Sequence, residues 1–272
     1  MDVSLEIVPR SFLSLKEDFL LCRSYDAINC INFPDLTRFS IRSWEACASF
    51  PRDTGTDAAG AEAALPVLMP HLRARDFSPD APFPLRGYFR KWNIRRVLVI
   101  AGDPPNDGGN KPGEDFFRYP PVLSRKCPEE TATVVFIKKL RTEMPELEIY
   151  VAFDPYRTNI RYELDYLEQK EKAGAVGFMS QPFFDLRLLE IYAEYLEGKQ
   201  VFWGVAPVLS MQSQAYWESR NRAVFPRSFR ADITWNIDFA KRVFNFCGRN
   251  NFNLYLMPIK LNLKTYLRGI FG

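Results

Sequence analysis

Two carboxylates stand inside or directly after apolar runs of the sequence. Glu6 lies within VSLEIV (3–8), and Asp103 follows VLVIA (97–101) just before two prolines. A carboxylate buried in a strand must be paired, or it stays protonated because desolvation raises its pKa. A carboxylic acid that is protonated at neutral pH can act as a general acid. Glu6 could instead lie at a frayed edge, and Asp103 could serve only the turn.

Other polar residues also lie in or just after apolar runs, in separate parts of the chain: Asn32, His71, Asp154, Gln181 and Lys260. Each of them alone has a plain structural explanation. His71 is the only histidine, and a single histidine is more often a core or loop residue than a ligand. Gln181 could be a core amide that is satisfied by hydrogen bonds.

Eight short apolar runs, bounded by breakers, indicate the strands that would hold these residues. They cover 3–8, 26–33, 65–72, 95–103, 148–155, 175–181, 200–208 and 252–258. Helical spacing falls between them at 129–143, 159–172, 186–196 and 235–247. Strands that alternate with helices pair in parallel, and eight such units close a sheet on itself. No GxGxxG follows the first strand, which disfavours a doubly wound open sheet. We therefore predict one (β/α)8 TIM barrel domain over residues 1–272.

In such barrels the chemistry lies at the carboxyl ends of the strands. Convergence of polar residues from six or seven strands at that end is far less expected by chance than any one of them, so the sequence predicts a site there. One histidine and dispersed carboxylates do not make a zinc triad. A GxSxG elbow and a GK[ST] phosphate loop are both absent from the sequence.

The composition restricts the class of protein. Net charge is +3, from 36 basic and 33 acidic residues that are well mixed, which gives no nucleic-acid footprint. Five scattered cysteines without CxxC spacing favour a reducing compartment. The N-terminus lacks a signal-peptide core, and no apolar run is long enough for a membrane. We expect a cytoplasmic protein with a small-molecule substrate and no nucleic-acid or membrane partner, and homo-oligomerisation stays open.

Several motifs resemble one family in its order along the chain: LEIVPR (5–10), PHL (70–72), AGDPP (101–105), AGAVGFMSQPFFD (173–185), WGVAPV (203–208) and LYLMP (254–258). They are similar to the catalytic domain of the methylenetetrahydrofolate reductases, and the similarity covers nearly the whole chain. The resemblance implies a (β/α)8 barrel that holds FAD at its mouth. NADH or NADPH would reduce the flavin, which would then reduce 5,10-methylenetetrahydrofolate to 5-methyltetrahydrofolate.

The resemblance also implies roles for individual residues. Glu6 matches the acid that protonates a folate nitrogen, and Asp103 matches the carboxylate beside flavin and pterin. The implied cofactor-binding residues are Asn32, His71, Gly102, Asp103, Phe153, Glu163 and Lys170. The implied folate-binding residues are Gln181, Gln214, Trp217 and Lys260.

Some positions depart from the family pattern. Ala101 stands where the family has an arginine, which removes a flavin contact, and Phe153 keeps a stacking ring without its hydroxyl. Two alternatives therefore accompany the flavoenzyme. One is direct hydride transfer from the nicotinamide to the same substrate, without a flavin. The other is a non-catalytic barrel subunit that binds folate or flavin.

Overall fold

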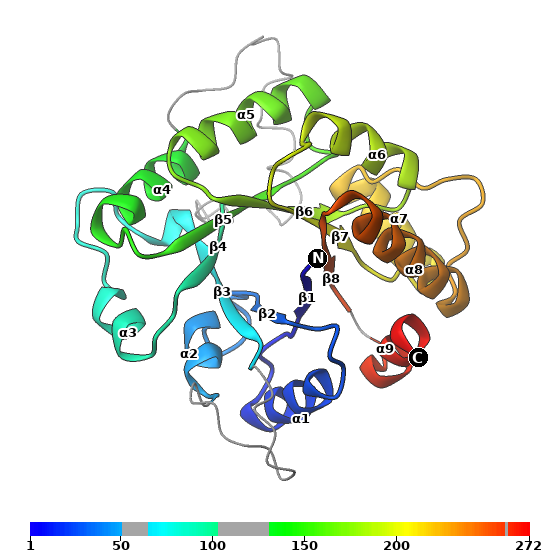
Figure 1. Ribbon diagram of the computed structural model, residues 1–272, viewed down its shortest axis with the longest axis horizontal. Helices are drawn as coiled ribbons and strands as arrows, with labels where there is room; N and C mark the ends of the chain where they lie inside the picture. The colour runs from blue at the N-terminus through cyan, green and yellow to red at the C-terminus, as the bar shows by residue number, and fades with distance from the viewer. Residues whose placement is uncertain (51–64, 103–130, 259–260) are drawn as a thin grey trace, which may run out of the picture.

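Eight parallel strands form a closed barrel in which each strand pairs with the next along the chain and β8 pairs with β1. The computed structural model describes residues 1–50, 65–102, 131–258 and 261–272 (Figure 1). The predicted (β/α)8 barrel is therefore confirmed. The strands are β1 (Val3–Glu6), β2 (Cys30–Phe33), β3 (Val67–Arg73), β4 (Arg96–Ile100), β5 (Glu148–Phe153), β6 (Gly177–Pro182), β7 (Val201–Val205) and β8 (Asn253–Leu256). Each of the eight apolar runs in the sequence contains one of these strands, or most of it.

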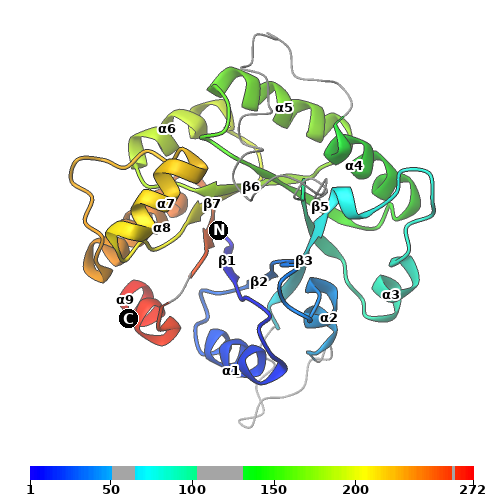
Figure 2. The same cartoon turned by 180° about the vertical axis from the view of Figure 1, so that it is seen from behind.

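The helices surround the barrel, as the front and back views show (Figure 1, Figure 2). The four predicted helices correspond to α4 (Ala132–Glu143), α5 (Ile160–Lys172), α6 (Leu186–Tyr195) and α8 (Ile233–Asn250). The others are α1 (Phe12–Arg23), α2 (Ser43–Ala48), α3 (Arg86–Lys91), α7 (Met211–Asn221), α9 (Leu263–Phe271) and the short 3₁₀ helix η1 (Ala74–Asp76). Of the helices described, none is both long enough and apolar enough to cross a bilayer.

Capping side chains determine where the predicted helices begin. Thr131, Asn159, Asp185 and Asp232 each precede a helix and accept a hydrogen bond from a backbone N–H of its first turn. Such caps satisfy amide groups that have no partner within the helix. Three of the helices that the sequence did not predict have weaker signals: α2 and α3 are only six residues long, and α7 buries none of its side chains.

Alternation along the strands separates two apolar regions. Leu5, Ile31 and Leu72 belong to the large core between the sheet and the helices. Their neighbours in sequence point the other way, because successive side chains of a strand face opposite sides of the sheet. A second cluster fills the barrel with one or two residues from most strands: Cys30, Met69, Leu98, Tyr150, Met179, Phe202, Ala206, Tyr255 and Met257. On β1, β2 and β3, the polar residues that alternate with residues of the outer core therefore point into the barrel, as the residues of this cluster do.

Candidate active site

Glu6 is the last residue of β1 and faces the barrel interior, because Leu5 and Ile7 on either side of it pack into the outer core. Its carboxylate accepts a hydrogen bond from the hydroxyl of Tyr255. Burial raises the pKa of Glu6 from 4.5 to about 7, and the Tyr255 hydrogen bond opposes part of that rise. The side chain keeps partial contact with solvent. Near neutral pH this carboxyl can therefore both give and take a proton.

Tyr255 supplies the donor side of this pair from the neighbouring strand β8. It is 3% exposed, and its pKa is raised well above 10, first by burial and then by the negative charge of Glu6. The phenol consequently stays protonated whenever Glu6 is ionised. It is a fixed hydrogen-bond donor for the carboxylate form of Glu6, and such bonds to a charged group are the stronger kind.

Asn32 lies directly opposite Glu6 in the β1–β2 pairing and is fully buried. Its Nδ2 donates to the hydroxyl of Ser4. Its Oδ1 is buried and has no hydrogen-bond partner among the described residues. The Ser4 bond fixes the amide so that this oxygen is the atom left to accept.

His71, on β3, faces the same interior, since Leu72 next to it belongs to the outer core. The residue is 5% exposed, and in the described part of the chain its Nε2 has no hydrogen-bond partner. Burial lowers the pKa of His71 from 6.5 to about 3, although the negative charge of Asp35 acts in the opposite direction. The imidazole is therefore neutral at physiological pH. Tyr255, Glu6, Asn32 and His71 lie on four consecutive strands of the closed barrel, and we call them the polar arc.

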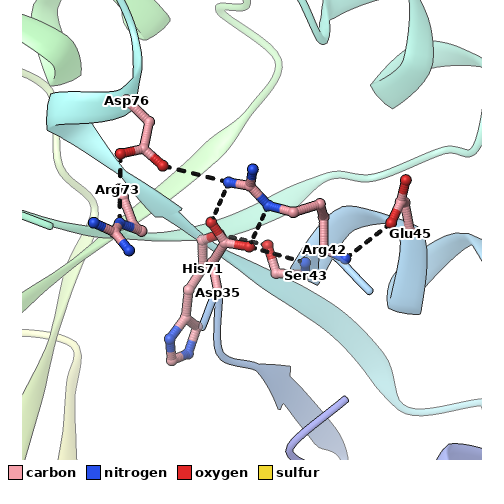
Figure 3. Close-up of polar contacts among 7 residues, drawn as sticks. All are labelled: Asp35, Arg42, Ser43, Glu45, His71, Arg73 and Asp76. Carbon is pink, nitrogen blue, oxygen red and sulfur yellow. Dashed lines mark hydrogen bonds and ion pairs between the residues drawn. The ribbon is translucent and has the colours of Figure 1, made fainter. Parts of the chain in front are cut away.

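A network of charged groups lies close to His71 (Figure 3). Asp35 accepts two bonds from the Arg42 guanidinium, at 2.9 and 2.5 Å. Arg42 also lies 3.3 Å from Asp76, which in turn lies 3.5 Å from Nε of Arg73. The His71 ring extends to the side away from Asp76 (Figure 3). The network therefore joins the segment after β2 to the end of β3 and leaves the imidazole outside its hydrogen bonds.

Ser43 connects this network to the backbone of the arc. Its hydroxyl donates to the carbonyl of His71 at 2.6 Å, and its amide donates to Asp35 at 3.3 Å. The position of β3 is thus held through main-chain groups. The side chain of His71 is not needed for that purpose.

The wall opposite the arc is apolar. Ile100 and Ala152 pack against the inner cluster from β4 and β5, and Trp217 packs against it from α7. The indole of Trp217 also makes an edge-to-face contact with Phe184, at 5.3 Å between ring centroids. A molecule at this end of the barrel would therefore meet hydrogen-bonding groups on one side and apolar surface on the other.

Gln181 lies at an irregularity in the pairing of β6 with β7 and is exposed. A side chain on Gly204 of β7 would come within 2.5 Å of the Ser180 carbonyl and 2.9 Å of the Gln181 carbonyl, so only glycine fits there. Gln214 is bonded to Glu218 within α7, at 2.9 Å. Neither glutamine contacts the arc through a hydrogen bond between described residues.

Gly102 follows β4 with φ +80°, a left-handed conformation that favours glycine. A Cβ there would lie 3.1 Å from Cβ of Arg73. The backbone conformation therefore explains why a glycine stands at position 102, where the sequence suggested a cofactor-binding role. Asp103 and Lys260, the other predicted residues of this region and of the end of β8, lie outside the described residues.

Three residues that were expected to hold a flavin cofactor do not face the barrel interior. The Phe153 ring is buried in the layer between sheet and helices, 6.0 Å from the Trp203 ring. Lys170 on α5 donates to the carbonyl of Ala152 at 2.7 Å. Glu163, also on α5, accepts from the amide of Asp154 at 3.3 Å. These side chains fasten α5 to the end of β5, so the expected flavin contacts are wrong for this arrangement.

Within the ranges that the structure describes, no three His, Cys, Asp or Glu side chains lie together as metal ligands would. The sequence-based prediction also missed Tyr255, Ser4 and the Asp35–Arg42 pair. Tyr255 carried a usable signal, because it sits between Leu254 and Leu256 in a strand whose leucines pack outward. The ion pair carried none, since its members are seven residues apart in a segment without periodicity.

The comparisons with known proteins agree on the fold. Two structures of oxaloacetate acetylhydrolase, one of them in complex with the inhibitor 3,3-difluorooxalacetate, superpose with a TM-score of 0.54 at 8% identity. They cover 94% and 95% of this chain and 74% and 76% of their own. A 2,3-dimethylmalate lyase of the PEP mutase/isocitrate lyase superfamily reaches a TM-score of 0.48 at 10% identity, over 92% of this chain and 82% of its own. The sequence matches no protein-family model and no curated protein.

These findings overturn the resemblance to methylenetetrahydrofolate reductase. No family model supports it, and the two structures that superpose with a TM-score of 0.54 are of an oxaloacetate acetylhydrolase, not of a flavin-dependent oxidoreductase. The expected FAD, the NADH or NADPH donor and the folate substrate are therefore wrong. The flavin-free and non-catalytic variants of that hypothesis are wrong with it. The motifs misled because one barrel fold hosts many unrelated functions, so motifs at the strand ends do not by themselves establish the chemistry.

Proposed function

We propose that this barrel is an enzyme that transfers a proton to or from a small carbonyl compound at the C-terminal mouth, with Glu6 as the proton donor and acceptor. The observation that carries the proposal is a half-buried glutamate, at the end of a barrel strand, whose carboxyl pKa is raised to about 7. Active sites of this fold lie at that end. A general acid or base works best when its pKa is near the working pH.

Glu6 transfers the proton, and Tyr255 stabilises the carboxylate that remains. The protonated carboxyl of Glu6 gives its proton to the substrate and becomes a carboxylate, which the hydroxyl of Tyr255 then stabilises by donating a hydrogen bond. In the reverse direction the carboxylate removes a proton from carbon next to a carbonyl group. Tyr255 keeps its own proton throughout, because its pKa is raised well above 10.

The choice of carbonyl compounds is supported by the function of the similar barrels. The oxaloacetate acetylhydrolase structure contains an inhibitor derived from an oxo acid. At 8% identity this likeness concerns the fold, so it guides the test compounds and does not fix the substrate. The raised pKa of Glu6 is what makes proton transfer the proposed step.

The test is exchange of carbon-bound hydrogen for deuterium. Pyruvate, hydroxyacetone and dihydroxyacetone are incubated with the protein in D₂O, and loss of the C–H signals is followed by proton NMR. We expect exchange above the protein-free rate for at least one compound, reduced about 10²–10⁴-fold in Glu6→Gln. Glu190→Gln, an exposed glutamate on α6, is the matched control and should keep the wild-type rate. Exchange that is absent for all three compounds, or that Glu6→Gln leaves unchanged, would contradict the proposal.

A further inference from the structure

Two buried atoms of the polar arc, on the neighbouring strands β2 and β3, have no hydrogen-bond partner among the described residues. They are Oδ1 of Asn32 and Nε2 of His71. Asn32 pairs with Met69, and His71 lies two residues further along the same inner face of β3. A buried polar atom without a hydrogen bond costs about 1–3 kcal/mol. Two such atoms on the inner face, one of them in the residue directly opposite Glu6, indicate that a bound molecule supplies the missing partners.

We propose that Asn32 and His71 form a recognition site for an uncharged hydroxyl or amide group of the ligand on which Glu6 acts. The inference rests on the proposed function, because it assigns the ligand chemistry of that same site. Asn32 accepts a hydrogen bond through Oδ1 while Ser4 holds its Nδ2. A neutral imidazole can accept or donate at Nε2, depending on its tautomer. A group that both donates and accepts, such as a hydroxyl or a primary amide, satisfies both atoms together.

The described cations near the arc, Arg42 and Arg73, are paired with Asp35 and Asp76, which disfavours an anion at this position. His71 is neutral because burial holds its pKa near 3. Arg42 is bound by Asp35 and Asp76, and the His71 ring extends away from Asp76 (Figure 3). Among the described residues, a carboxylate placed against Asn32 and His71 would lose its hydration and meet only cations that are already paired with Asp35 or Asp76, which is unfavourable. The desolvation cost of a hydroxyl or an amide is much smaller.

A purely structural role does not account for the side chain of His71. The backbone of β3 is held by the Ser43 hydroxyl on the His71 carbonyl, and the imidazole takes no part in that bond. An apolar residue of similar size would fill the same volume without leaving an unpaired atom. Replacing His71 by leucine should therefore maintain or raise the free energy of unfolding if its unpaired ring nitrogen serves a ligand.

The experiment compares hydroxyacetone with pyruvate, which carries a carboxylate in place of the hydroxymethyl group. Binding to the whole protein is measured by saturation-transfer NMR titration, at neutral pH. We expect hydroxyacetone to bind at least about tenfold more tightly than pyruvate, the effect of one well-formed hydrogen bond. Asn32→Leu and His71→Leu should each weaken hydroxyacetone binding about tenfold, and His71→Leu should do so without lowering the melting temperature. His71→Gln, which retains hydrogen-bonding capacity, should restore part of the affinity.

Three results would overturn the inference: pyruvate binding as tightly as hydroxyacetone, no binding of hydroxyacetone, or leucine variants with wild-type affinity. If His71→Leu does not fold, the affinities of His71→Gln and of the wild-type protein for hydroxyacetone and pyruvate are compared instead, and they test the inference in the same way. Glu6→Gln separates this inference from the proposed function. It should abolish deuterium exchange and leave hydroxyacetone affinity within about threefold, since hydrogen bonding to Asn32 and His71 does not involve the acid.

Discussion

Desolvation raises the pKa of both Glu6 and Glu163, and the two glutamates differ in what surrounds them. Glu163 lies near the positive charge of Lys170 and accepts from the amide of Asp154. Glu6 accepts from the neutral hydroxyl of Tyr255 at the end of β1. A nearby cation stabilises the ionised form of Glu163 and opposes the rise of its pKa, while Glu6 has only a hydrogen bond for that purpose.

The difference separates a carboxylate that serves the structure from the carboxyl that is proposed to transfer a proton. Glu163 and Lys170 hold α5 against β5, through bonds to Asp154 and Ala152, and they lie outside the barrel. Glu6 lies inside it, partly open to solvent, where a proton can be exchanged with a bound molecule. Burial alone therefore does not identify a catalytic acid. The partner and the face of the sheet decide the role.

The largest expected effect concerns activity. Glu6→Gln should lower the deuterium-exchange rate about 10²–10⁴-fold, whereas Glu163→Gln should change it less than about tenfold in the folded protein. Both rates are to be measured by proton NMR at a temperature where circular dichroism shows each variant fully folded. Equal losses of activity in the two folded variants would remove the distinction between them.

The second effect concerns the pH dependence of stability. The pKa of Glu6 is about 7 in the folded protein, against an ordinary value of 4.5, so its contribution to stability is complete below pH 4.5 and is lost as pH rises through 7. Glu6→Gln removes this dependence, and the variant should gain up to about 3 kcal/mol relative to wild type between these limits. Urea unfolding across that range measures the difference. A constant difference would show that Glu6 ionises normally.

The third effect concerns the structural pair. Lys170→Met removes the cation beside Glu163 and the bond to the Ala152 carbonyl, and should lower the free energy of unfolding by about 1–3 kcal/mol. Deuterium exchange in the folded variant should stay near wild type. Chemical denaturation gives the stability, with Lys172→Met on the exposed side of α5 as the matched control. A Lys170 variant as stable as that control would show that the pair does not fasten α5.

The smallest effect concerns Tyr255. Tyr255→Phe removes the hydrogen bond that opposes the effect of burial on Glu6, so the pKa of Glu6 should rise further, by about one unit. If Glu6 acts as the acid, the pH at which activity falls should move up by the same amount. The pH profile of deuterium exchange measures this shift. An unchanged profile would mean that Tyr255 does not control the proton on Glu6.

The arrangement of the barrel could be predicted from the sequence because its signals are local. Eight apolar runs and four periodic helices are each visible within a short window, and capping residues such as Asn159 and Asp232 mark helix starts. Glu6 could be identified from the sequence because a charged residue among apolar neighbours is unusual within a strand. Fold topology then places it at a barrel end without further information.

The partners of Glu6 could not be predicted in the same way. Tyr255 is 249 residues away from Glu6, and the contact exists only because β8 closes the barrel against β1. The cofactor-binding roles of Phe153, Glu163 and Lys170 came from the resemblance of motifs, which does not show on which face a side chain lies. These roles were therefore wrong. The alternation of neighbours would have placed Phe153 on the outer side, with Ile149 and Val151.

The measurement that tests the account most directly is the pKa of the Glu6 carboxyl. The protein is prepared with ¹³C at the glutamate side-chain carboxyl, and the resonance of Glu6 is assigned by its absence in Glu6→Gln. We predict that this resonance titrates at about pH 7, as burial beside Tyr255 requires. A midpoint at the ordinary value of 4.5 would contradict the account, because the barrel mouth would then hold a permanently ionised carboxylate and no acid.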